Sequence, residues 1–293
     1  MTAAISGAGQ ANPAGHTVNP GENPAAIGDD YWVSVSAGPF LMGTDEAPPD
    51  GEPSASQPMH TVHVDAFDIA RRPVTVAEFA WFVADTGYVT TAEQRGESWV
   101  WHGGEDTTTP DQDHLWKATP GATWQVPRGP GSDVAGKDDH PVTHVSYLDC
   151  LEYCRWSGTR LPTEAEWEKA ARGTDGRNYP WGNTPPTPQS CNHTMNVGDT
   201  TPVGQYPAAA GVYGPEDMVG NVWEIMANGY HRYPYDPNKT KRLVTKKGTV
   251  ELGVIRGGSF YNNCSPRGVL VWVRIYNPPD YSCYDMGFRL CRM

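Results

Sequence analysis

The sequence has no hydrophobic run approaching the ~20 residues that a helix needs to cross a bilayer, and its N-terminus has neither a basic nor an apolar segment of the secretory kind. We therefore expect a cytoplasmic protein with no membrane partner. Basic side chains are also few, 22 Lys and Arg against 34 Asp and Glu, for a formal net charge of -12. Because nucleic-acid phosphates are bound through Lys and Arg, this balance argues against a nucleic-acid partner.

Cysteine is scarce too, and six residues are too few to build a disulfide scaffold in a chain of 293. We expect most of them to be free thiols. Cys150 and Cys154 lie four residues apart, on one face of an expected helix, and are most simply interpreted as small buried side chains rather than zinc ligands. The six are Cys150, Cys154, Cys191, Cys264, Cys283 and Cys291.

Turn-forming residues and large aromatic rings are abundant, with 32 Gly, 27 Pro and 11 Trp. This composition is typical of irregular structure stabilised by aromatic packing. Residues 1–29 are rich in Ala, Gly, Asn and Pro and have almost no large apolar side chains, so we expect a disordered N-terminal tail. The remainder, residues 30–293, is of a size that suits one domain.

Strand patterns occur near both ends of that domain. Residues 32–43 form a strand pattern interrupted by a Gly-Pro turn, and residues 60–69 alternate apolar and polar side chains, so the two could pair in antiparallel fashion. Residues 254–260 and 286–292 are expected to be closing strands. By contrast, residues 93–139 show no sustained periodicity and predict a long ordered loop.

Three short helices have clear start signals, a hydroxyl followed three residues later by a carboxylate. These starts are Thr75-Val-Ala-Glu78, Ser146-Tyr-Leu-Asp149 and Thr163-Glu-Ala-Glu166. The second helix can end at Gly158 and the third at Gly173, because glycine readily takes the left-handed conformation of a C-cap.

A series of short segments resembles, in order, the signature blocks of the sulfatase-modifying-factor family of formylglycine-generating enzymes. The resemblance implies an α+β, irregular single-domain fold with a C-type-lectin-like core and little regular secondary structure, often with bound calcium. The segments are Gly38-Pro-Phe-Leu-Met-Gly, Arg72-Pro-Val-Thr-Val-Ala-Glu-Phe, Phe82-Val-Ala-Asp-Thr-Gly-Tyr, Asp139-His-Pro-Val-Thr-His-Val, Arg160-Leu-Pro-Thr-Glu-Ala-Glu-Trp-Glu, Gly220-Asn-Val-Trp-Glu, Arg256-Gly-Gly-Ser and Gly287-Phe-Arg.

Candidate calcium ligands can be named from their oxygen chemistry. Asp217, Asn221 and Glu224 offer the hard oxygen ligands that calcium prefers, and Asn192 and Asp199 offer a second set. The alternative is that these are turn-forming residues and a surface carboxylate.

The family's usual copper site is missing from this sequence. The resemblance implies copper(I) held by two thiolates, one three residues after the Ser of Arg-Gly-Gly-Ser and one five residues further on. Here these positions are Asn262 and Arg267, and neither can supply the soft sulfur ligand that copper(I) selects. Cys264 and Cys283, from two C-terminal loops, could instead form a shifted catalytic copper site or a disulfide.

A second oxidative chemistry is implied by resemblance to the sulfoxide synthases of ergothioneine-type pathways, which join this fold to a helical domain carrying a three-histidine iron site. This chain has no such helical domain. Its nine histidines are scattered, and His60 with His63, or His140 with His144, are more simply interpreted as strand and turn residues.

The same fold also occurs in variable proteins of diversity-generating retroelements, in which adenine-directed mutagenesis rewrites the stretch before a fixed Gly-Phe-Arg ending. Residues 260–285 contain no Lys, Glu, Gln or Met and one Trp, which fits such mutagenesis, and they interleave aromatic with small polar side chains, as paratopes do. Phe260 and Trp272 could equally fill the core, and Ser259 and Arg274, which match the family's substrate-groove positions, could equally be structural. The candidate ligand-binding residues are Ser259, Phe260, Tyr261, Asn262, Asn263, Trp272, Arg274, Tyr276, Tyr281 and Tyr284.

The sequence thus predicts a monomeric protein of formylglycine-generating-enzyme type whose C-terminal groove, about residues 259–286, binds a peptide or protein ligand. The alternative is a copper-dependent oxidase that converts a sulfatase cysteine to formylglycine, or performs another oxidation, with an altered cysteine site. A non-catalytic paralogue that pairs with an active enzyme fits the missing cysteines equally well.

Overall fold

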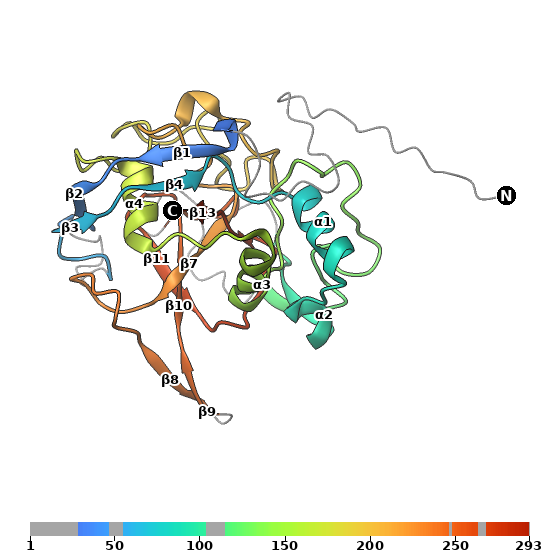
Figure 1. Cartoon of the computed structure of the whole chain (residues 1–293). Helices are drawn as coiled ribbons and strands as arrows, with labels where there is room; N and C mark the ends of the chain where they lie inside the picture. The colour runs from blue at the N-terminus through green and yellow to red at the C-terminus, as the bar shows by residue number, and fades with distance from the viewer. Residues whose placement is uncertain (1–28, 47–54, 104–114, 246–247, 263–267, 293) are drawn as a thin grey trace.

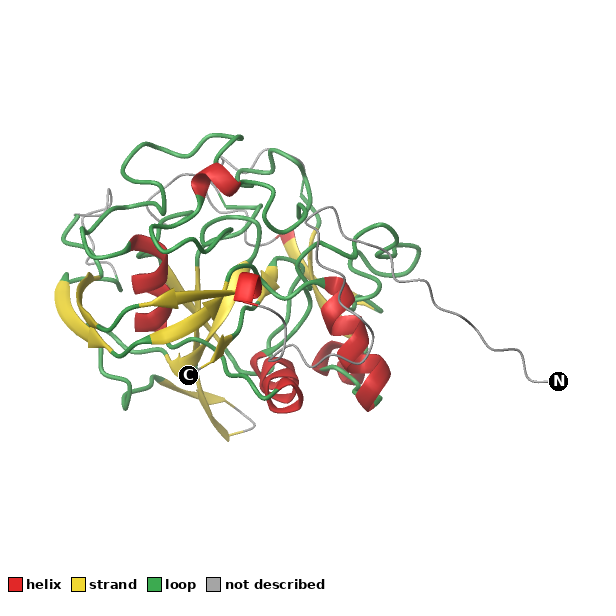
Figure 2. Cartoon of the chain, turned by 45° about the horizontal axis from the view of Figure 1, so that its top comes forward, coloured by secondary structure: helices red, strands yellow, loops and turns green. Residues whose placement is uncertain are grey.

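The computed structural model describes residues 29–46, 55–103, 115–245, 248–262 and 268–292. Its α+β architecture has few helices and several small sheets joined by long loops (Figure 1 and Figure 2), as the sequence predicts. The helical elements are η2 (Asp29–Tyr31), α1 (Val76–Thr86), α2 (Thr91–Arg95), α3 (Tyr147–Ser157), α4 (Glu164–Arg172) and η4 (Pro207–Ala209). Among the described residues, no helix is long and apolar enough to span a membrane.

The strands form two larger sheets and three hairpin-like pairs. One sheet has the order β1-β4-β13 and the other β11-β10-β7-β12, while β2 pairs with β3, β5 with β6, and β8 with β9. The strands are β1 (Trp32–Val35), β2 (Gly38–Met42), β3 (His60–Val64), β4 (Phe67–Ala70), β5 (Glu97–Trp101), β6 (Trp116–Pro120), β7 (Trp223–Gly229), β8 (Arg242–Thr245), β9 (Gly248–Glu251), β10 (Gly253–Arg256), β11 (Arg274–Asn277), β12 (Met286–Gly287) and β13 (Cys291–Arg292).

The three predicted helix starts are confirmed. Thr75, Ser146 and Thr163 each accept from the backbone N–H three residues on, and the carboxylate at that position bonds back to the cap, which satisfies the otherwise unpaired first-turn donors. The predicted ends of α3 and α4 are confirmed, because Gly158 and Gly173 are the C-cap residues. The left-handed cap is found at Gly158, with φ 71° and ψ 23°, but Gly173 has φ 70° and ψ -141°, outside that conformation. The expected antiparallel pairing is also confirmed, because β1 pairs with β4 and β2 with β3.

The prediction of a long loop over residues 93–139 is wrong in its first part. That stretch contains most of α2, and it contains β5 and β6, which pair in antiparallel register from Glu97↔Pro120 to Trp101↔Trp116. The missed signal is Glu97-Ser-Trp-Val-Trp101, a short run of β-favouring residues in which the exposed Glu97 and Trp99 alternate with buried Ser98 and Val100.

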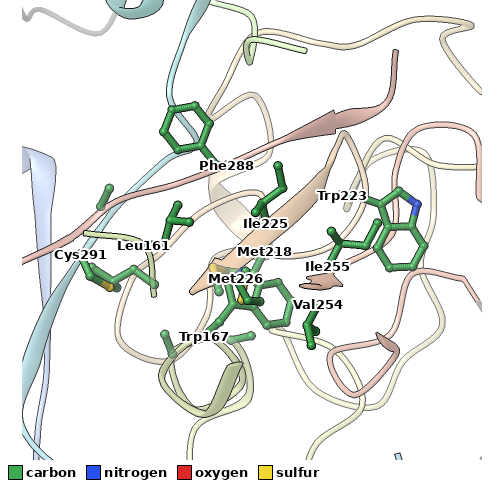
Figure 3. Close-up of a cluster of buried hydrophobic side chains, with 14 of the residues drawn as sticks. Leu161, Trp167, Met218, Trp223, Ile225, Met226, Val254, Ile255, Phe288 and Cys291 are labelled. Carbon is green, nitrogen blue, oxygen red and sulfur yellow. The ribbon is translucent and has the colours of Figure 1, made fainter. Parts of the chain in front are cut away.

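The core lies where α4 packs against the sheet of β7 and β10. Figure 3 shows Trp167 beside Met226 of β7 and Val254 of β10, while Ile225 and Ile255 point to the other side of these strands, toward Phe288. Trp167 is fully buried, and its Nε1 donates to Glu224 at 2.8 Å, so the indole N–H is satisfied. This core fixes the ends of β10 and β12, between which the candidate site lies.

Candidate functional site

A buried polar cluster joins the turn after β10 to the segment before β12. Ser259 Oγ lies 2.7 Å from Asp285 Oδ2 and 2.9 Å from Asn262 Oδ1, and the Ser259 N–H donates to that same amide oxygen at 2.9 Å. The thiol of Cys283 donates to Asp285 Oδ1 at 3.0 Å. We call Ser259, Asn262, Cys283 and Asp285 the polar cluster.

Local backbone features bring these residues together. Gly257 and Gly258 follow β10 with φ of 95° and 72°, and a Cβ on either would meet a backbone oxygen, of Met218 or Gly268, at 2.9 Å. Asp285 is fixed because its carbonyl accepts from the Trp223 N–H at 2.8 Å, where β12 runs parallel to β7. The turn therefore requires glycine at both positions for Ser259 to reach Asp285.

Burial raises the pKa of both acidic groups in the polar cluster, Asp285 and Cys283. Desolvation raises the pKa of Asp285, although the hydrogen bonds from Cys283 and Ser259 oppose that shift. Burial, followed by the nearby Asp285 charge, raises the pKa of the Cys283 thiol well above its ordinary value. Cys283 is therefore a protonated thiol that donates to a carboxyl group.

This chemistry does not fit copper(I) at Cys283. A thiolate is the form that binds copper(I), and Cys283 is 5% exposed with its proton committed to Asp285. Asn262, at the first family cysteine position, is built into the Ser259 turn through its side-chain oxygen. Cys264, Arg267 and Asn263 lie outside the described residues, so the predicted pairing of Cys264 with Cys283 stays a prediction.

The predicted ligand-binding residues divide into two groups. Ser259, Phe260, Trp272, Arg274 and Tyr284 are buried, at 0–5% exposure. Tyr261, Asn262 and Tyr281 are half-buried, and Tyr276 is 42% exposed. Among the described candidates, a ligand at the surface could therefore contact only the second group directly.

Arg274, the first residue of β11, has a structural role. Its guanidinium donates to both oxygens of Glu164, at 2.5 and 2.8 Å, and to the His231 carbonyl at 2.6 Å, and its side chain is fully buried. Arg256 also contacts Glu164, at 3.2 Å, and bonds to Glu168, which in turn accepts from Arg172 at 2.8 Å. This ion network fastens α4 to β10 and β11.

A row of aromatic side chains lies beside the polar cluster; Trp101 is buried, Trp116, Tyr261 and Tyr281 are half-buried, and Trp99 is exposed. Trp99 and Trp101 are two residues apart in β5 and therefore point to the same face of the strand. The Trp99 ring is 6.1 Å from that of Tyr281, and the Tyr261 ring is 4.4 Å from Trp101 and 5.4 Å from Trp116. We call Trp99, Trp101, Trp116, Tyr261 and Tyr281 the aromatic row; Trp99 is 37% exposed.

The aromatic row is attached to the polar cluster through the backbone. The Tyr284 N–H donates to the Trp99 carbonyl at 2.9 Å, the Ser98 hydroxyl donates to the Ser282 carbonyl at 2.9 Å, and Trp99 forms a parallel bridge with Cys283. A ligand that contacts the row would therefore lie against the segment that holds Cys283. The tryptophans of the row were missed from the sequence because β5 was assigned to a loop.

Tyr284, which lies between Cys283 and Asp285 in the chain, contacts the ion pair of Asp199 and Lys137. Its hydroxyl donates to Asp199 Oδ1 at 2.6 Å, while Lys137 Nζ donates to Asp199 Oδ2 at 2.6 Å. The Tyr284 ring stacks on His144, whose pKa burial lowers to about 4, so this imidazole is neutral at pH 7. Tyr284 is therefore held on two sides and is part of the scaffold.

The five predicted calcium ligands have different partners. Both oxygens of Glu224 bond to Arg289, and Asp199 pairs with Lys137, so these two carboxylates already neutralise cations. Burial raises the pKa of Asp217 to about 6, and its Oδ2 accepts from the Gly204 N–H.

Asn192 fits a cation better than the other four, whereas the side-chain oxygen of Asn221 already accepts from Asn192 and from the Thr201 N–H. The two amides contact each other at 3.3 Å, and Asn192 Oδ1 is buried with no hydrogen-bond partner in the described part of the chain. A buried carbonyl oxygen without a donor is unfavourable unless a cation or water meets it. We propose that Asn192 Oδ1 is a ligand of a bound calcium ion.

Calcium removal tests this proposal. We expect saturating calcium to raise the melting temperature by several degrees over the value in EDTA, because a ligand that binds only the folded state stabilises it. Asn192→Ala should remove that difference, and a Leu148→Ala control on α3 should retain it. Equal melting temperatures of the unsubstituted chain in calcium and EDTA would contradict the proposal.

Comparison with known proteins places this geometry in a family. Residues 19–293 match the sulfatase-modifying factor enzyme 1-like domain. The chain is 39% identical over 282 residues to a formylglycine-generating enzyme of Thermomonospora curvata, covering 88% of this chain and 91% of that protein. It is 36% identical over 284 residues to the inactive C-alpha-formylglycine-generating enzyme 2 of Mus musculus, covering 89% and 85%. The chain belongs to the formylglycine-generating enzyme family.

Solved structures have a similar fold. PvdO from Pseudomonas aeruginosa aligns with a TM-score of 0.64 at 24% identity, covering 89% of this chain and 93% of that one. Treponema denticola variable protein 1 aligns with a TM-score of 0.57 at 19% identity, covering 89% and 94%. At these identities the likeness shows the shared fold alone.

Proposed function

We propose that this chain is a binding member of the formylglycine-generating enzyme family, which takes a peptide or protein segment along the aromatic row and does not oxidise it through Cys283. The observation that carries the proposal is the polar cluster. Asn262 is the acceptor that shapes the Ser259 turn, and Cys283 is a buried thiol that donates to Asp285. Among the described residues, a hydrogen-bonded amide and a buried thiol therefore stand where copper–thiolate chemistry would need thiolates.

The aromatic row supports the binding half of the proposal. Aromatic side chains bury large contact areas at a low cost in conformational entropy and dominate the affinity of many interfaces. Trp99 and Tyr281 offer partly exposed rings next to each other, over a backbone fixed by β5. An extended peptide segment fits a row of this kind, because alternate side chains of the peptide can each contact a ring.

One relative gives a precedent for a binding member of the family. The mouse protein is named as an inactive member of the family, and a protein that keeps the fold without the oxidation would be of the same type. Diversification by a retroelement remains the narrower form of the proposal. A near copy of the coding segment for residues 260–285, differing chiefly at adenines and lying near the gene, would support that form.

The oxidase is the second candidate, favoured by the 39% identity to the Thermomonospora curvata enzyme. Copper(I) titration separates the two functions. We expect Cys283→Ser and Cys264→Ser to leave the copper(I) affinity of the chain unchanged, because Cys283 is a protonated, buried thiol. Cys150→Ala, at a buried thiol of α3, is the matched control.

Tight copper(I) binding by the unsubstituted chain that disappears in both the Cys264 and Cys283 variants, and persists in the Cys150 variant, would overturn the proposal. That result would establish a shifted cysteine site and favour the oxidase.

A further inference from the structure

Figure 1 shows the β8–β9 hairpin extending from the body of the protein near β10. A recess is lined by residues at the start of this hairpin and by residues of the segments that follow β7 and form β11. It has a volume of about 800 Å³, within the range of small-molecule sites. No residue of the aromatic row lines it. Its walls include Tyr230, Arg232, Lys239, Lys241, Arg242 and Tyr276.

The recess is basic in a protein whose net charge is -12. Four cationic side chains line it, and none of the residues that line it is acidic. Lys239 pairs with Asp236 at 3.4 Å and Arg242 with Glu251 at 2.9 Å, both at the surface. No carboxylate in the described ranges pairs with Lys241 or Arg232. Two positive charges therefore remain for a ligand.

Lys241 is held in place against two rings. Its N–H donates to the Tyr230 carbonyl, and its own carbonyl accepts from the Leu252 N–H at 3.0 Å. The ammonium lies 4.3 Å from the centre of the Tyr276 ring and 5.9 Å from that of Tyr230. Cation–π contact of this kind positions the charge without neutralising it.

His231 supplies an independent sign of a missing partner. This side chain is 6% exposed, and its Nε2 accepts from the Asp236 N–H at 2.7 Å, so the ring proton lies on Nδ1. Nδ1 is buried and has no hydrogen-bond partner in the described residues. His231 is one of the residues that line the recess, and a buried N–H without an acceptor is unfavourable.

We infer that this recess binds a small phosphate monoester, with its phosphate on Lys241 and Arg232 and its organic part against Tyr276. A phosphate monoester carries a charge of about -1.5 to -2 at pH 7, which two unpaired cations match. Lysine and arginine are the residues that bind phosphate oxygens in proteins. The Tyr276 ring, 42% exposed, offers apolar area to the rest of the ligand. The inference does not depend on the proposed peptide binding.

Isothermal titration calorimetry of the full chain, with phenyl phosphate and with inorganic phosphate, measures the two affinities that test the inference. We expect phenyl phosphate to bind more tightly than inorganic phosphate. Lys241→Gln should weaken phenyl phosphate binding by ~10-fold or more, because a charge-assisted contact is lost. Arg155→Gln, on the exposed face of α3, removes the same charge away from the recess and should change the affinity less than ~2-fold.

Tyr276→Ala should reduce the affinity for phenyl phosphate and leave that for inorganic phosphate unchanged. Failure of phenyl phosphate to bind, or equal losses in the Lys241 and Arg155 variants, would overturn the inference. Equal affinity for the two probes would also overturn it, because the site would then recognise free phosphate.

Discussion

Replacing Arg274 by alanine should lower the free energy of unfolding by about 3–5 kcal/mol, the cost expected when one partner of a buried ion pair is removed. Glu164 would keep its charge in the core, with Arg256 as its remaining close cation. The His231 carbonyl would lose its donor as well, and Tyr230 and Tyr233 would lose the guanidinium that lies over their rings.

Urea-induced unfolding at pH 7 measures this change. Arg155→Ala is the matched control, because Arg155 pairs with Glu152 at the surface of α3 and such pairs contribute less than about 1 kcal/mol. A loss below about 1 kcal/mol for Arg274→Ala would contradict the structural role that the Glu164 contacts imply. It would return Arg274 to the candidate ligand-binding residues.

Features set by neighbours in the chain could be predicted from the sequence. The capping boxes at Thr75, Ser146 and Thr163 involve residues three apart, and their glycine C-caps follow within one helix length. The order of the family segments also predicted the fold, because each segment is short and fixed in sequence. These signals require no knowledge of which distant residues meet.

The candidate site depends on contacts between distant residues and could be predicted only in part. Glu164 meets Arg274 across 110 positions, so no local pattern revealed that Arg274 is committed to an ion network. The sequence pointed to Cys283, but the pKa of its thiol depends on burial, which the fold imposes. The aromatic row brings β5 together with Tyr261 and Tyr281, which lie far along the chain, so sequence spacing could not predict that these side chains meet.

The second large effect concerns the aromatic row. Trp99→Ala and Tyr281→Ala should each weaken the binding of a peptide ligand by ~10-fold or more, because central aromatic residues contribute ~2 kcal/mol or more to many interfaces. Trp99 is 37% exposed, so its replacement should change the melting temperature little compared with a core tryptophan such as Trp167. Tyr284→Ala should behave differently, because the Tyr284 ring is buried and its hydroxyl bonds to Asp199.

The most direct test of the account begins with peptides that are selected from a random display library for binding to the unsubstituted chain. The affinity of each selected peptide is then measured by fluorescence polarisation. The panel is the unsubstituted chain, Trp99→Ala, Tyr281→Ala and the control Leu148→Ala, which removes an exposed apolar side chain from α3. The account predicts that most selected peptides lose affinity in the two aromatic variants and keep it in the control, with all proteins folded. Peptides that bind all four proteins equally would contradict a binding site on the aromatic row.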